Sequence, residues 1–169
     1  ADQADYDRAF IDFARGVRPG GIYIISADDP GCIRVTEAVR TMDDFAGTIV
    51  TLGEQEGADW RYRRSDDGWQ VIDADGCAHP IALQIPGAHN VANATAAIIA
   101  LTTLGYSVED AIRGVEAFSG VGRRFEHKGV AGGVDVVDDY AHHPDEIRAT
   151  LLGTADRYPG RRRVVLFQP

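Results

Sequence analysis

The chain has few cysteines, no long apolar run and little positive charge, and each shortage excludes a class of protein. Cys32 and Cys77 are isolated, with no C-x-x-C pair, so no disulfide framework is predicted and a reducing cytoplasm is expected. No apolar stretch approaches the roughly 18 residues that a membrane-spanning helix needs. No charged segment followed by an apolar core opens the chain, so no secretory signal is predicted.

The excess of acidic over basic residues limits the possible partners. Lys and Arg number 17 against 26 Asp and Glu, which gives a formal net charge of −9. A surface of this sign argues against nucleic acid or an anionic membrane as the main partner. With 169 residues, 44% of them hydrophobic, the chain is long enough for one domain or slightly more.

Apolar patterning predicts an α/β protein. Unbroken apolar runs at residues 21–25 and 48–52 indicate buried parallel strands. Alternation and glycine turns between residues 60 and 85 indicate a small antiparallel sheet beside them. The predicted helices are residues 6–15, 36–42, 89–104, 108–118 and 144–158.

The glycine-containing segment at residues 119–122 predicts a hinge. We therefore expect two parts, residues 1–122 and residues 123–169, with a boundary near Gly122. Strands at residues 134–137 and 164–167 flank the last helix, so the second part is expected to contain a right-handed, parallel strand–helix–strand unit. This part has roughly 45 residues, near the size at which a core no longer sustains itself, and it is expected to be mobile or to lean on the first part.

The most informative stretch is D-D-Y-A-H-H-P at residues 138–144. It lies between a predicted strand and a helix start, and the carboxyl end of a strand is where open α/β sheets bind ligands. Three interpretations are open. In the first, Asp139 caps a structural turn. In the second, a metal is bound by Asp138, Asp139, His142 and His143, although the spacing is not a familiar zinc pattern. In the third, the aspartates accept hydrogen bonds from ribose hydroxyls beside a substrate carboxylate. The third is favoured.

Two other groups of polar residues suit a ligand. Asn90 is expected to cap the alanine-rich helix, and Asn93 lies on the same helix face, where paired amides could read an adenine edge. The alternative is that the two asparagines only cap and pack the helix and bind no ligand. Arg123 and Arg124 follow the hinge and are either a solvated pair or a fork for phosphate or carboxylate.

Four motifs in this order resemble the Mur ligases. They are G-x-H-N-x-x-N-A at residues 87–94, F-x-G-x-x-R-R-F at 118–125, D-D-Y-A-H-H-P at 138–144 and F-Q-P at 167–169. The resemblance covers most of residues 85–169 and is fainter before them. It implies the second half of a P-loop-type, ATP-binding central domain (1–122) followed by the start of a Rossmann-like C-terminal domain (123–169).

The resemblance also implies an activity. Mur ligases are cytoplasmic, ATP- and Mg²⁺-dependent, amide-forming enzymes of peptidoglycan synthesis, and the F-Q-P ending favours the branch that joins L-alanine to UDP-N-acetylmuramate through an acyl phosphate. Asn90 and Asn93 would then lie at the adenine end of ATP. Arg124 would reach the phosphate side, and Asp139 would hold the ribose hydroxyls.

The same resemblance implies roles nearer the chemistry. Tyr140, His142 and His143 would face the junction where the amino acid enters, and His142 and Arg124 would be catalytic. No residue of the chain is assigned to the metal, because the family's principal magnesium and phosphate ligands precede the region covered here.

The sequence departs from the family pattern in ways that limit the expected activity. The phosphate-binding loop G-x-x-x-x-G-K-[ST] does not occur, because Lys128 is the only lysine and Gly129 follows it. Ala88 stands where relatives often carry a basic residue. The chain alone is therefore expected to be inactive and to need the other domains of the same parent polypeptide. The alternatives are a metal-dependent hydrolase built on the D-D-x-x-H-H cluster and a non-catalytic nucleotide-binding module.

Overall fold

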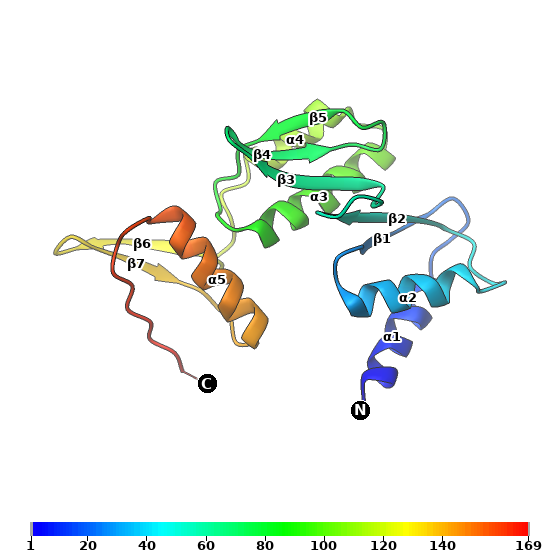
Figure 1. Ribbon diagram of the computed structural model, residues 1–169, viewed down its shortest axis with the longest axis horizontal. Helices are drawn as coiled ribbons and strands as arrows, with labels where there is room; N and C mark the ends of the chain where they lie inside the picture. The colour runs from blue at the N-terminus through cyan, green and yellow to red at the C-terminus, as the bar shows by residue number, and fades with distance from the viewer. Residues whose placement is uncertain (1, 169) are drawn as a thin grey trace.

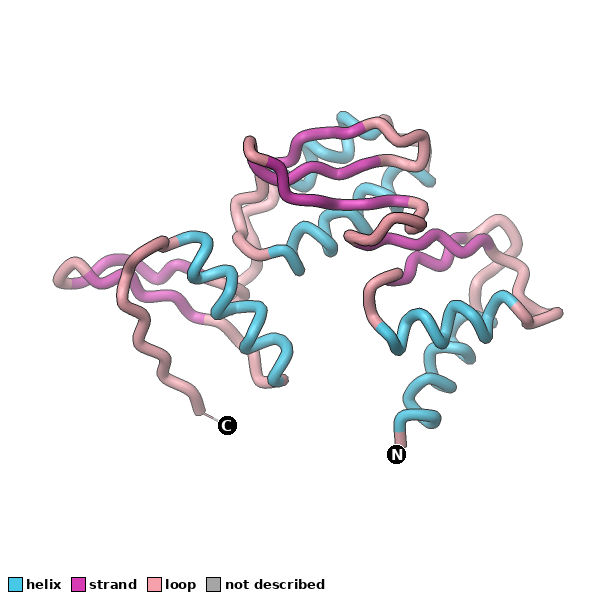
Figure 2. Tube along the Cα trace, in the orientation of Figure 1, coloured by secondary structure: helices cyan, strands magenta, loops and turns pink. Residues whose placement is uncertain are grey.

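Two sheets of different size organise the chain (Figure 1). The computed structural model describes residues 2–168, and the predicted α/β class is confirmed (Figure 2). None of the helices in this range is both long and apolar enough to cross a membrane. In chain order the elements are α1 (Gln3–Arg15), β1 (Ile22–Ser26), α2 (Pro30–Arg40), β2 (Thr48–Gly53), β3 (Trp60–Ser65), β4 (Gly68–Ile72), β5 (Ala78–Ile81), α3 (Ala88–Thr103), α4 (Val108–Glu116), β6 (Glu126–Ala131), β7 (Val134–Asp138) and α5 (Pro144–Arg157).

The larger sheet has the order β1-β2-β3-β4-β5, with β1, β2 and β3 parallel and β3, β4 and β5 antiparallel. The antiparallel strands predicted in this region are confirmed, and they continue the parallel strands in one mixed sheet. The parallel and antiparallel strands form one sheet because β2 pairs with β3: Leu52 lies opposite Trp60 and Gly53 opposite Arg61. These strands overlap only at the end of β2 and the start of β3, so the parallel pair needs no long crossover.

The main core lies between this sheet and α3. Val91, Ile98 and Ile99 of α3 are buried against the sheet, where Val71 is also fully enclosed. The one buried hydroxyl of the helix, on Thr95, donates to the carbonyl oxygen of Val91 at 2.8 Å, so its burial leaves no donor unpaired. Helix α3 is thereby held rigidly on the sheet.

Helices α1 and α2 form a second layer beside β1, and α2 is longer than predicted. Asp29 caps it, because its Oδ1 accepts from the N–H of Cys32 at 2.8 Å, and Pro30 occupies the first helical turn. The stretch D-D-P at residues 28–30 therefore contains the start of α2.

The second part consists of the β6–β7 hairpin, α5 and the segment that follows (Figure 1). Helix α5 begins at Pro144 as predicted. The predicted strand at residues 164–167 is wrong: the segment pairs with no strand in the described range, and Leu166 is 96% exposed. A two-stranded hairpin is a weak template for a further parallel strand, and a cleft of about 510 Å³ separates this segment from β7 and α5. Pro169, the last residue of the F-Q-P motif, lies outside the described residues.

Candidate functional site

A cleft of about 910 Å³ lies between α3, the segment after α4, and α5. Four polar side chains that the sequence predicts as nucleotide contacts line it together: Asn90, Asn93, Arg124 and Asp139. They come from three separate motifs, and the fold brings them to one place. The larger apolar side chains that line the same cleft are Leu83, Ile85, Leu101, Val115, Phe118, Val121 and Phe125.

Helix α3 supplies the two amides. Gly87, and not Asn90, is the N-cap, so the predicted capping role of Asn90 is wrong. The Nδ2 of Asn90 instead donates to the carbonyl oxygen of Pro86 at 2.7 Å. This bond fixes the orientation of the amide and leaves its Oδ1 to accept from a ligand. Asn93 is exposed one turn further along the helix.

His89 was not assigned a role from the sequence, although it stands inside the G-x-H-N motif. Gly87 has a φ of +105°, and a β-carbon there would lie 2.6 Å from Cε1 of His89. The positive φ favours glycine at this position, and the absence of a side chain leaves room for the imidazole ring beside it. Protein atoms around the ring lower the pKa of His89 below its ordinary value; the negative charge of Asp139 opposes this shift, and Arg124 reinforces it.

Asp139 joins the end of β7 to the turn before β6. Its Oδ2 accepts from the N–H of Phe125 and its Oδ1 from the N–H of Ala141, each at 2.8 Å. The turn is strained, since Arg123 and Phe125 have φ values of +59° and +49°. Each oxygen keeps a free lone pair, so Asp139 can shape the cleft and still accept from ligand hydroxyls.

Glu146 is a second cleft residue that sequence reasoning passed over. Its Oε2 accepts from the N–H groups of His142 and His143 at 3.1 and 3.3 Å, and its Oε1 lies 3.6 Å from Nη1 of Arg124. The two backbone donors, helped by the charge of Arg124, hold the pKa of Glu146 below its ordinary value. A Glu in the first turn of a helix could have revealed this capping role.

The other predicted site residues lie outside the cleft lining. His143 is the N-cap of α5, where its Nδ1 accepts from the N–H of Asp145 at 3.4 Å. His142 Nδ1 lies 3.1 Å from the carbonyl oxygen of Tyr140, and the Tyr140 ring is 4.8 Å from the Arg123 guanidinium. Of the predicted catalytic pair, Arg124 lines the cleft and His142 does not.

The D-D-x-x-H-H cluster does not form a metal centre in this arrangement. Between residues 2 and 168, no three side chains of His, Cys, Asp or Glu converge as metal ligands. Asp138 pairs instead with Arg123 at 3.6 Å, and both oxygens of Asp139 accept from backbone donors. This geometry does not support the hydrolase interpretation.

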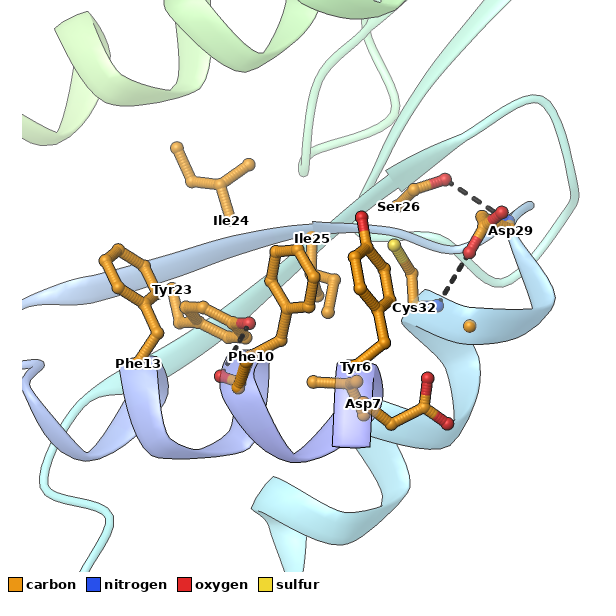
Figure 3. A pocket seen from close by; sticks show the side chains of 13 residues that line it. Tyr6, Asp7, Phe10, Phe13, Tyr23, Ile24, Ile25, Ser26, Asp29 and Cys32 are labelled. Carbon is orange, nitrogen blue, oxygen red and sulfur yellow. Dashed lines mark hydrogen bonds between the residues drawn. The ribbon is translucent and has the colours of Figure 1, made fainter. Parts of the chain in front are cut away.

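A second cleft, of about 730 Å³, lies between α1, β1 and α2 (Figure 3). Aromatic side chains dominate its wall: Tyr6, Phe10 and Phe13 of α1 face Tyr23 of β1. It contains none of the residues that the sequence predicts as functional. The cleft at α3, which contains Asn90, Asn93, Arg124 and Asp139, is therefore the candidate site.

The five-stranded mixed sheet, the two-stranded antiparallel sheet and the helices around them place the chain among the mixed α/β proteins. Within that class, the chain belongs to the Mur ligase family. The description "Mur ligase middle domain" matches residues 1–101, and "Mur ligase, glutamate ligase domain" matches residues 123–169.

Individual relatives agree with the family. The UDP-N-acetylmuramate–L-alanine ligase of Clavibacter michiganensis is 40% identical over 167 residues, which cover 97% of this chain and 33% of that protein. Among solved structures, MurF from Acinetobacter baumannii has a TM-score of 0.70 at 28% identity over 86% of this chain and 32% of its own. MurC from Thermotoga maritima has a TM-score of 0.66 at 27% identity over 91% and 34%. The chain thus spans about a third of the length of these proteins.

Proposed function

We propose that the chain is part of an ATP-dependent ligase that joins L-alanine to UDP-N-acetylmuramate in peptidoglycan synthesis, and that the cleft at α3 binds the ATP. The proposal rests on one observation above all. Asn90, Asn93, Arg124 and Asp139, chosen from separate motifs, line a single cleft.

The chemistry of the cleft suits a nucleotide. Apolar side chains such as Phe118 and Leu83 offer a surface for a flat base, and amides offer both donors and acceptors to its edge. Arg124 supplies a planar guanidinium for phosphate. Asp139 supplies free carboxylate lone pairs for ribose hydroxyls. Oε1 of Glu146 lies 3.6 Å from Nη1 of Arg124 at the same cleft.

The reaction we propose has two stages. A phosphoryl group passes from ATP to the muramyl carboxylate, and the amine of L-alanine then displaces phosphate to form the amide. Tyr140, His142 and His143 would lie where the amino acid enters, with His142 and Arg124 acting on the reacting groups. Mg²⁺ would neutralise charge on the phosphates, and we assign none of its ligands to residues 2–168, where no metal-binding cluster forms.

The division of labour follows from the same proposal. Residues 1–122 would be the second half of the central domain and residues 123–169 the start of the C-terminal domain. We propose that this segment provides the base and ribose side of the nucleotide site, while other parts of the parent polypeptide cradle the phosphates. The isolated chain should therefore bind nucleotide weakly and form no amide.

Calorimetric titration of ATP into the chain tests the proposal. Asn93→Ala should weaken ATP binding by roughly three- to tenfold, the worth of a neutral hydrogen bond. Gln84→Ala is the matched control, because its amide donates outside the cleft to the carbonyl oxygen of Glu116. Equal ATP affinity in all three proteins would refute the assignment of the cleft.

A further inference from the structure

Helix α5 approaches the start of α3 at a single buried glycine. Gly153 is the only buried residue of α5, whereas its neighbour Leu152 is 62% exposed. A β-carbon built on Gly153 would lie 3.5 Å from the carbonyl oxygen of Pro86 and 3.6 Å from Cα of Gly87. The two backbones therefore meet with no side chain between them.

This contact lies beside the candidate nucleotide cleft, which Asn90 of α3 and Ala149 and Thr150 of α5 line. The carbonyl oxygen of Pro86 that faces Gly153 is the one that accepts from Nδ2 of Asn90. Gly87 is also the N-cap of α3. Displacement of the Pro86–Gly87 backbone would therefore shift the amide of Asn90.

Two ion pairs lie on either side of the glycine along α5. Nη1 of Arg64, on β3, is 3.3 Å from Oδ2 of Asp156, and Arg124 meets Glu146 near the other end of the helix. Exposed ion pairs of this kind contribute little free energy. They can fix the rotation of α5, but the close backbone approach at Gly153 sets its distance from α3.

We propose that Gly153 is a positioning residue, which sets the separation between the α3 wall of the cleft (Asn90, Asn93) and the opposite wall (Asp139, Glu146). The effect on nucleotide binding rests on the proposed function. The docking of α5 on α3 does not, because it follows from the contact alone.

Alanine and leucine distinguish this role from a simple helix effect. Both are strong helix formers, and each is favoured over glycine in a helix interior. The β-carbon of alanine would make ordinary van der Waals contacts at Gly153. The longer side chain of leucine would meet the Pro86–Gly87 backbone and push α5 away. A difference between these two variants therefore reports the contact and not helix propensity.

Double electron–electron resonance on the chain itself measures the docking. Spin labels are placed on the native Cys77 and on Arg157→Cys, both exposed positions, in a Cys32→Ser background. Gly153→Ala should give the parent distance distribution, and Gly153→Leu should give a longer or broader one. If Gly153→Leu does not fold, Gly153→Met, with an unbranched and more flexible side chain, takes its place. An unchanged distribution in a folded leucine or methionine variant overturns the docking role.

ATP titration of the same variants separates the two ideas. We expect Gly153→Leu to bind ATP at least roughly tenfold more weakly, because the side chains on the two sides of the cleft would no longer be spaced to contact the nucleotide together. Gly153→Ala should bind ATP within twofold of the parent. Unchanged ATP affinity despite a shifted distance overturns the positioning role. If the parent itself binds no ATP, the proposed function fails, and the distance measurement still decides whether Gly153 docks α5.

Discussion

Asp139→Ala should destabilise the second part of the chain far more than the neighbouring substitution Asp138→Ala. Asp139 accepts from two backbone N–H groups, those of Phe125 and Ala141. A hydrogen bond to a charged group contributes about 1.5–3 kcal/mol net. Because Asp139 is only partly buried, the low end applies, and two such bonds give about 3 kcal/mol.

Asp138→Ala is the matched control, because it removes a neighbouring carboxylate that makes different contacts. The carboxylate of Asp138 meets only the exposed guanidinium of Arg123, at 3.6 Å, and such pairs contribute below about 1 kcal/mol. Native-state hydrogen exchange at the amides of β6 and β7 gives the opening free energy of this part directly. The amides of Phe125 and Ala141 should also lose protection in Asp139→Ala.

The reasoning would be refuted if Asp138→Ala and Asp139→Ala lowered the opening free energy by equal amounts. It would also be refuted if Phe125 kept its protection in Asp139→Ala. Asp139→Asn offers an intermediate point, because the amide oxygen can still accept one of the two bonds. Its cost should lie between those of the other two substitutions.

Three further outcomes are expected. His89 should titrate below its ordinary pKa in nuclear magnetic resonance spectra. The stability that its neutral form adds is therefore present above that ordinary pKa and is lost as the pH falls below it. Titration at or above pH 6.5 would contradict this. Burial, helped by the charges of Asp28 and Glu54, raises the pKa of Tyr62 to about 12, so its protonated form stabilises the fold below pH 10 and loses that effect between pH 10 and about 12. Tyr62→Phe should accordingly remove the last step of an ultraviolet tyrosine titration, and a last step that survives would count against the assignment. Asp29→Ala should cost about 1 kcal/mol in urea denaturation through loss of the α2 cap, while an unchanged midpoint would show that the cap is dispensable.

The sequence predicted the strongly periodic elements well. Helix α3 and strands β1, β2 and β7 lie within one or two residues of their expected bounds, because burial on the sheet enforces the patterns that were read. Helix α2 begins earlier than predicted because its first turn contains few apolar residues, and Asp29 and Pro30 mark its start. Both the correct and the incorrect predictions of these elements rested on the local sequence pattern.

Pairing between strands could not be read from local pattern. The β2–β3 pair that unites the larger sheet depends on the loop between them, where Asp59 accepts from the N–H and the hydroxyl of Thr51, each at 2.8 Å. For the segment 164–167, apolar β-branched residues favoured a strand, but a strand also needs a partner edge. That requirement is tertiary and is invisible in the segment itself.

The candidate site was partly within reach of sequence. Amides and carboxylates in separate motifs were assigned to one ligand, and the structure brings Asn90, Asn93, Arg124 and Asp139 to one cleft. The assignment of these residues to ATP stays a prediction. His89 was missed because its role depends on the φ of Gly87, and Gly153 because a glycine within a helix gives no sign of what it touches.

The aromatic surface of α1 bears on how the isolated chain behaves in solution. Tyr6, Phe10 and Phe13 are exposed beside β1, which ends the larger sheet and has no strand on its outer side in the described range. An open strand edge next to exposed rings favours self-association. The net charge of −9 opposes this by repulsion, whose reach shrinks to about 10 Å at 0.1 M salt. Colloidal stability should therefore fall as salt is added, and dilute, low-salt buffers are the conditions that keep copies of the chain apart.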